Sequence, residues 1–132
     1  MRAINHIGIA VKSLDEALTL YRALGLEVSG REEVESQKVK VAMLPVRGSQ
    51  IELLEPTAPD SPIAVAIEKR GEGLHHICFE VEDIRAAMGQ LKEAGFQLLS
   101  DEPKAGAHGS QVCFLHPRSG RGVLIELCQP AH

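Results

Sequence analysis

The sequence of 132 residues predicts an α+β fold built from two tandem βαβββ modules. Three observations support this prediction. The strand-like segments that begin at His6 and His76 lie 70 positions apart, and each leads into an amphipathic helix. Two further strand-like segments joined by a turn follow each helix. The last segment of each module carries one acid within an apolar run, at Glu52 and at Glu126.

The first module is expected at about residues 1–56. Ser13 and Glu16 form a capping-box pattern at the start of its helix, and Gly25 marks the end of the helix. Apolar residues at helical spacing give this helix one buried face: Leu14, Ala17, Leu18, Tyr21 and Leu24. Two strand-like segments with a turn between them complete the module: 39–46 and 50–55.

A linker helix is expected at about residues 61–71. Ser61 suits the N-cap position and Pro62 suits the first turn of a helix. This helix joins the two modules, so that residues 1–132 are interpreted as a single domain. We expect the two modules to face each other across a cleft.

The second module is expected at about residues 74–129. Asp83 is the expected N-cap of its helix, and Gly95 marks the end. The apolar face of this helix has the same spacing as in the first module: Ile84, Ala87, Met88, Leu91 and Ala94. Two strand-like segments follow: 111–115 and 123–128.

Composition excludes several classes of function. The net charge is −4, and no basic stripe with interleaved aromatic residues is present, which argues against a nucleic-acid partner. No charged region leads into a long apolar run, so we expect neither a signal peptide nor a membrane span. The three cysteines all lie in apolar runs: Cys78, Cys113 and Cys128. We expect them to be reduced core residues of a cytoplasmic protein.

Two adjacent histidines, His75 and His76, begin the second module. Neighbouring residues on a strand point to opposite faces, so these two rings cannot serve the same purpose. His76 corresponds to His6 in the first module, whereas His75 corresponds to Asn5, which cannot titrate. His76 is therefore the candidate functional residue, and His75 is expected on the outer face.

Four residues form the candidate metal site. If two similar halves pair about a pseudo-twofold axis, equivalent positions on their inner faces converge near that axis. These positions hold two histidines and two carboxylates, a set suited to a divalent first-row metal: His6, Glu52, His76 and Glu126. A single histidine of this kind is more often a hydrogen-bonded core residue, and a single acid is more often paired with Arg or Lys. Duplication of both residues favours the metal site.

Five segments, which run nearly from end to end, resemble the vicinal-oxygen-chelate superfamily and, within it, the methylmalonyl-CoA epimerase family. They are "INHIGIAVKSLDEAL", "IELLEPTAPDSPIA", "GEGLHHICFEVEDI", "LLSDEPKAGAHG" and "FLHPRSGRGVLIEL". The combination of "DSPIA", "GLHHI", "GAHG" and "FLHP" is more specific than the repeated modules alone. The resemblance implies the vicinal-oxygen-chelate fold with a metal-centred cleft, in a homodimer.

The resemblance also implies roles for individual residues. His6, His76 and Glu126 are implied as metal ligands, and residue 52 as the fourth ligand position, where some members carry Gln. Co²⁺ is the implied metal, while the ligand types alone also admit Zn²⁺, Ni²⁺ or Mn²⁺. Glu52 and Glu126 are the expected catalytic carboxylates. Some members place a carboxylate base where the alignment puts Lys40, which makes Lys40 an alternative to Glu52.

The implied activity is interconversion of (R)- and (S)-methylmalonyl-CoA. A proton is removed from the carbon beside the thioester, and a bound metal stabilises the resulting enolate as a Lewis acid. Two alternatives remain: a lactoylglutathione lyase of the glyoxalase-I type, which uses nearly the same ligands, and a non-catalytic ligand-binding module. A ring-cleaving iron dioxygenase is disfavoured, because a second carboxylate occupies a position that dioxygen needs.

Overall fold

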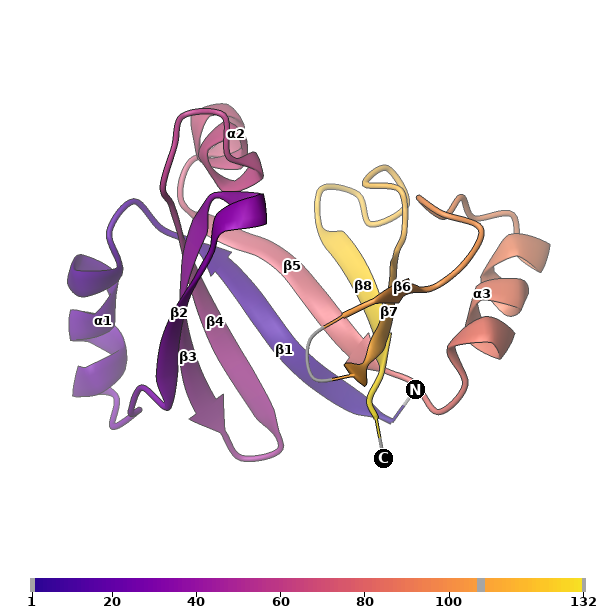
Figure 1. Ribbon diagram of the computed structural model, residues 1–132, viewed down its shortest axis with the longest axis horizontal. Helices are drawn as coiled ribbons and strands as arrows, with labels where there is room; N and C mark the ends of the chain where they lie inside the picture. Colours follow the sequence, from indigo (N-terminus) through magenta and orange to yellow (C-terminus); the bar gives the residue numbers. More distant parts are fainter. Residues whose placement is uncertain (1, 107–108, 132) are drawn as a thin grey trace. The chain divides into compact units, whose positions relative to one another are not determined.

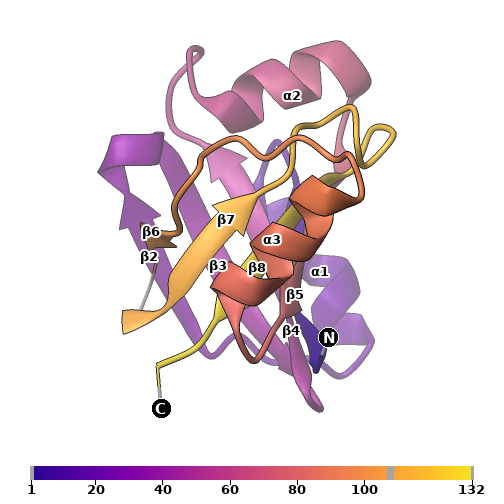
Figure 2. The same ribbon diagram turned by 90° about the vertical axis from the view of Figure 1, so that its right-hand side faces the viewer.

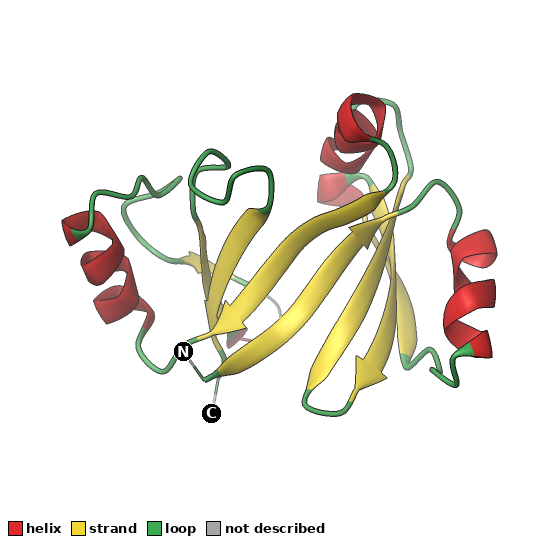
Figure 3. Ribbon diagram, turned by 180° about the vertical axis from the view of Figure 1, so that it is seen from behind, coloured by secondary structure: helices red, strands yellow, loops and turns green. Residues whose placement is uncertain are grey.

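The computed structural model describes residues 2–106 and 109–131, so part of the "GAHG" segment lies outside the described residues. The chain forms two compact units. The first unit comprises residues 6–75, and the second comprises residues 1–5 together with 76–132. The boundaries fall within two strands, Ala3–Ala10 and Gly73–Glu80, and each strand is described with the unit that holds most of its residues. Each unit contains a mixed β-sheet with helical cover, which confirms the predicted α+β class (Figure 3). That the two units form a single domain stays a prediction.

The first unit contains a four-stranded sheet in the order β2-β3-β4-β1 (Figure 1). Its elements follow the chain: β1 (Ala3–Ala10), α1 (Leu14–Ala23), β2 (Gly30–Val34), the 3₁₀ turn η1 (Glu35–Gln37), β3 (Val39–Val46), β4 (Ser49–Pro56) and α2 (Pro62–Arg70). The strands β2, β3 and β4 pair antiparallel, whereas β1 pairs parallel to β4. The opening and closing strands of the module are therefore direct neighbours.

The second unit repeats this plan with the order β5-β8-β7-β6 (Figure 2). Its elements are β5 (Gly73–Glu80), α3 (Ile84–Glu93), β6 (Lys104–Ala105), β7 (Gln111–Phe114) and β8 (Leu124–Gln129). Again the opening strand β5 pairs parallel to the closing strand β8. The strands β2 and β6 were not located from the sequence, because both are short and polar.

The helices cover the sheets through alternate strand residues. In the first unit, Leu18 of α1 packs with Leu44 and Leu53, all of them fully buried. The neighbouring residue Leu54 points to the other sheet face, where it packs with Ile63 of α2. In the second unit α3 packs against β7 and β8 through a similar cluster. Because side chains alternate along a strand, α1 and α3 each cover only one face of their sheet.

The predicted helix ends are confirmed. Each predicted N-cap side chain accepts a hydrogen bond from a backbone N–H of the first turn: Ser13 from Glu16, Ser61 from Ile63 and Asp83 from Ala86. Gly25 and Gly95 have φ angles of 92° and 93°, a left-handed conformation that favours glycine after a helix. These ends occur at equivalent places in the two units.

The closing strand of each unit also holds the start of the amphipathic helix. The Leu14 N–H donates to Glu55 Oε1 at 2.8 Å, and the Ile84 N–H donates to Gln129 Oε1 at 2.9 Å. Both donors are among the first N–H groups of a helix, which lack partners within it. The same contact therefore fixes helix and closing strand together in both units. No described helix has the length and apolar character needed to cross a membrane.

Candidate metal-binding residues

His6 and Glu52 lie beside each other in the first unit. Gly8 pairs with Glu52 across β1 and β4, and His6 lies two residues before Gly8 on the same face of the sheet. The distance from His6 Nδ1 to Glu52 Oε2 is 3.7 Å. Gly8, which lies directly opposite Glu52, has no side chain.

Gln50 supports the position of Glu52. The Gln50 Nε2 donates to Glu52 Oε2 at 3.3 Å, and residues two apart on a strand share a face. This contact was not predicted from the sequence, although the spacing of Gln50 and Glu52 could have indicated it. The amide limits how far the Glu52 carboxylate can turn.

His76 and Glu126 form the corresponding pair in the second unit. Cys78 pairs with Glu126 across β5 and β8, and His76 lies two residues before Cys78 on the same face. The distance from His76 Nε2 to Glu126 Oε1 is 3.9 Å. In both units the histidine therefore precedes by two residues the position that pairs with the glutamate. The repeat predicted from the sequence is therefore also a repeat in the placement of each histidine beside its glutamate.

Both distances suit two ligands of one ion. They exceed the 2.7–3.2 Å of an ordinary N–H···O hydrogen bond. Two ligand atoms that each lie about 2.1 Å from a metal are at most about 4.2 Å apart. Imidazole nitrogen and carboxylate oxygen are ligands of divalent first-row metals. Each pair of side chains thus lies within this upper limit for two ligands of one ion.

Lys40 lies on the wrong face to replace Glu52 as a base. Lys40 pairs with Glu55, and Glu52 pairs with Met43 across the same two strands. Glu55 contacts the start of α1, so Lys40 and Glu55 occupy the sheet face that carries α1. Glu52 points to the opposite face, because its strand neighbour Leu53 packs against α1. The alternative role of Lys40 is therefore wrong, and strand alternation is the physical reason.

His75 and His76 alternate along β5 as predicted, so their side chains lie on opposite faces. Burial is the main cause that lowers the pKa of His75 below its ordinary value of 6.5, and the positive charge of Arg70 lowers it further. His75 thus differs from His76 both in position and in surroundings.

The cysteines are free thiols and buried. Burial raises the pKa of the Cys113 thiol to about 11, and burial also raises the pKa of Cys128. Thiols in this state are poor nucleophiles, since the thiolate is the reactive form. This agrees with the interpretation of the cysteines as core residues.

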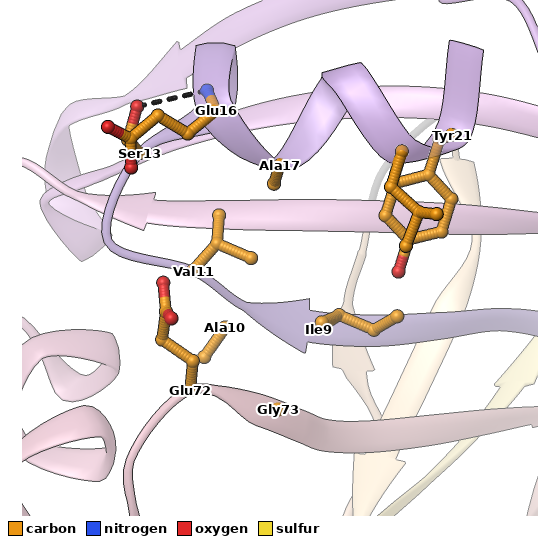
Figure 4. A pocket seen from close by; sticks show the side chains of 10 residues that line it. Ile9, Ala10, Val11, Ser13, Glu16, Ala17, Tyr21, Glu72 and Gly73 are labelled. Atoms are coloured by element: carbon orange, nitrogen blue, oxygen red, sulfur yellow. Dashed lines mark hydrogen bonds between the residues drawn. The ribbon is translucent and has the colours of Figure 1, made fainter. Parts of the chain in front are cut away.

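A hollow of about 370 Å³ lies on the α1 side of the first unit (Figure 4). Its apolar lining includes Ile9, Ala17 and Tyr21, and the carboxyl groups of Glu16 and Glu72 lie at its edge. The Lys12 N–H donates to Glu72 Oε1 at 2.7 Å. None of the candidate ligands lines this hollow. The hollow is therefore separate from the pair formed by His6 and Glu52 in the first unit.

Residues 5–114 match the family model of the Glyoxalase/Bleomycin resistance protein/Dioxygenase superfamily. The chain belongs to this superfamily. Among similar superfamily proteins is the ethylmalonyl-CoA/methylmalonyl-CoA epimerase of Cereibacter sphaeroides, 48% identical over 96% of each chain. The human mitochondrial methylmalonyl-CoA epimerase is 43% identical over 96% of this chain and 73% of its own length.

Solved structures of the superfamily share this fold. A methylmalonyl-CoA epimerase in complex with methylmalonyl-CoA and ammonium superposes with a TM-score of 0.87 and 42% identity. The match covers 99% of this chain and 96% of that one. The predicted family and the predicted vicinal-oxygen-chelate fold are thereby confirmed.

The pKa of His75 gives a direct test of the local structure. In chelator-treated protein, NMR should show that His75 titrates below 6.5, and Arg70→Met should move the titration upward. The unfolded chain then binds the proton more tightly, so the free energy of unfolding should fall as the pH drops below 6.5. Lys69→Met, which removes the adjacent charge on α2, is the control and should leave the titration in place. An unshifted His75 would contradict this account.

Proposed function

We propose that the protein is a methylmalonyl-CoA epimerase that interconverts the (R) and (S) forms of its substrate. The observation that carries this proposal is the duplicated histidine–glutamate pair, built with the same strand register in both units. Membership of the superfamily and the similarity to named epimerases support it. We further propose a homodimer, which the family resemblance implies, and a cytoplasmic location, which suits three free cysteines.

We propose that one divalent ion binds to His6, Glu52, His76 and Glu126. The distances within each pair support this ligand set, and the family resemblance favours Co²⁺ over Zn²⁺, Ni²⁺ or Mn²⁺. When bound, such an ion supplies Lewis-acid stabilisation to the negative charge that develops on the thioester oxygen. An ion that takes six ligands would keep two positions for substrate oxygens beside these four residues.

The two glutamates are the proposed proton carriers. Inversion at the α-carbon requires that a proton leave one face and return to the other, and a substrate held in place needs a base on each side. Glu52 and Glu126 come from equivalent positions of the two modules, which supports opposite placement. The Glu52 side chain is 21% exposed and that of Glu126 is 11% exposed. Because the Glu52 side chain is the more exposed of the two, we propose that Glu52 is the glutamate that the metal binds less firmly and that acts as a base.

Metal analysis tests the ligand set. His6→Ala, His76→Ala and Glu126→Ala should each lower the affinity for Co²⁺ more than about tenfold, because each removes a ligand. Equilibrium dialysis followed by elemental analysis measures the bound metal. His75→Ala is the matched control, since its ring lies on the other face of the same strand. Full occupancy in the His76→Ala protein, or loss of metal in the His75→Ala protein, would overturn the assignment.

Solvent exchange tests the activity. Proton NMR in D₂O should show loss of the α-proton signal of methylmalonyl-CoA, and a chelator should abolish this loss until Co²⁺ is restored. Faster turnover of the methylglyoxal–glutathione adduct would favour the lyase instead. Binding of methylmalonyl-CoA without any exchange would favour the non-catalytic module.

The same assay tests the role of Glu52. Glu52→Gln keeps an oxygen ligand but removes the base, so it should retain metal and lower kcat about a hundredfold or more. Lys40→Met is the control from the opposite sheet face and should keep nearly the original kcat. Unchanged turnover in the Glu52→Gln protein together with an inactive Lys40→Met protein would exclude the two-glutamate mechanism.

A further inference from the structure

A row of paired residues crosses the sheet of the first unit at Glu52. Gly30 on β2 pairs with Met43 on β3, Met43 pairs with Glu52 on β4, and Glu52 pairs with Gly8 on β1. Directly paired residues have their side chains on the same face of a sheet. Since the row ends in glycine on both sides, Met43 and Glu52 supply its only side chains. Met43 is thus the side chain that borders Glu52 within this row.

The Met43 side chain extends over Gly30. A Cβ atom placed on Gly30 would lie 3.5 Å from Met43 Cε, an ordinary van der Waals contact, so alanine fits beside the terminal methyl group but a side chain that extends beyond Cβ meets it. Met43 also packs against the apolar cluster that contains Val41 and Leu54. Methionine is unbranched and has three rotatable side-chain bonds, so it adapts readily to the space available. Gly30 therefore gives this side chain a place to lie away from Glu52.

The other neighbours of Glu52 on this face are less adaptable. Gln50 donates a hydrogen bond to the Glu52 carboxylate, which fixes its amide. Leu54 is buried in the apolar cluster beneath α2. Gly8 has no side chain. Met43 is accordingly the apolar neighbour whose conformation can change the space beside Glu52.

We propose that Met43 determines how large a substituent the substrate carries on its α-carbon. This inference rests on the proposed function, in which Glu52 exchanges a proton with that carbon. A base must lie within hydrogen-bond reach of the proton that it removes, so the α-substituent is held next to the row. With Met43 over Gly30, the space accepts an ethyl group as well as a methyl group. With Met43 turned toward Glu52, the space accepts only the methyl group.

Two substitutions with opposite effects test this proposal. The readout is the ratio of kcat/KM for ethylmalonyl-CoA to that for methylmalonyl-CoA, measured by α-proton exchange. Met43→Ala should raise this ratio about tenfold, the discrimination typical of one methylene group in an apolar pocket. Gly30→Val should lower the ratio, because its two γ-methyl groups extend beyond a Cβ that already contacts Met43 Cε and so compete with Met43 for this space. Gly30 is not among the residues with positive φ, so valine fits its backbone.

The double variant separates this mechanism from a general loosening of the unit. Gly30→Val combined with Met43→Ala should behave like Met43→Ala alone, because no methionine is left for the valine methyl groups to displace. Ile67→Ala truncates another residue of the same apolar cluster and should leave the ratio unchanged. Circular dichroism checks that each variant is folded, and Met43→Leu provides a milder replacement of similar volume.

The outcomes distinguish this inference from the proposed function. If the original protein exchanges the α-proton but Met43→Ala, Met43→Leu and Gly30→Val all leave the ratio unchanged, the role of Met43 is excluded and the proposed function stands. An equal change of ratio in Ile67→Ala also excludes it. If the original protein exchanges neither thioester, the proposed function fails and this inference fails with it.

Discussion

Parallel pairing between the opening and closing strands of each unit determines where the candidate ligands lie. Within the first unit, the register that pairs Gly8 with Glu52 brings His6 to 3.7 Å from the glutamate. A shift of one residue in β4 would turn Glu52 toward α1 and turn Leu53 out of its core. The apolar core under α1 therefore fixes the register of β1 and β4, and this register places His6 beside Glu52.

Placing Glu52 and Glu126 at positions of low exposure costs free energy unless a positive charge compensates the carboxylates. Removing a carboxylate from water costs several kcal/mol when no charge compensates it. The neighbouring histidine is fully charged only when it is protonated, whereas a divalent cation is charged at every pH. A metal ion would therefore stabilise these two carboxylates, which are 21% and 11% exposed, in their charged form.

Much of this could be predicted from sequence, because the signals were local or repeated. Ser13 and Asp83 mark helix starts through their own hydrogen bonds, and the two histidines are recognised by their equivalent positions. The face of Lys40 could not be predicted, since it depends on a pairing with Glu55 that no local pattern encodes. Nor could the short polar strands β2 and β6, because strands at a sheet edge need little apolar surface. The position of Met43 between Gly30 and Glu52 could not be predicted either, because it depends on the register of β2, β3 and β4.

We propose that both histidine–glutamate pairs bind a single metal ion. An anomalous-scattering map from crystals loaded with Co²⁺ would locate every bound ion. A single shared ion should give one strong peak per chain, about 2.0–2.2 Å from a ligand atom of each of His6, Glu52, His76 and Glu126. A peak bound by only one of the two pairs, or a separate ion at each pair, would contradict it.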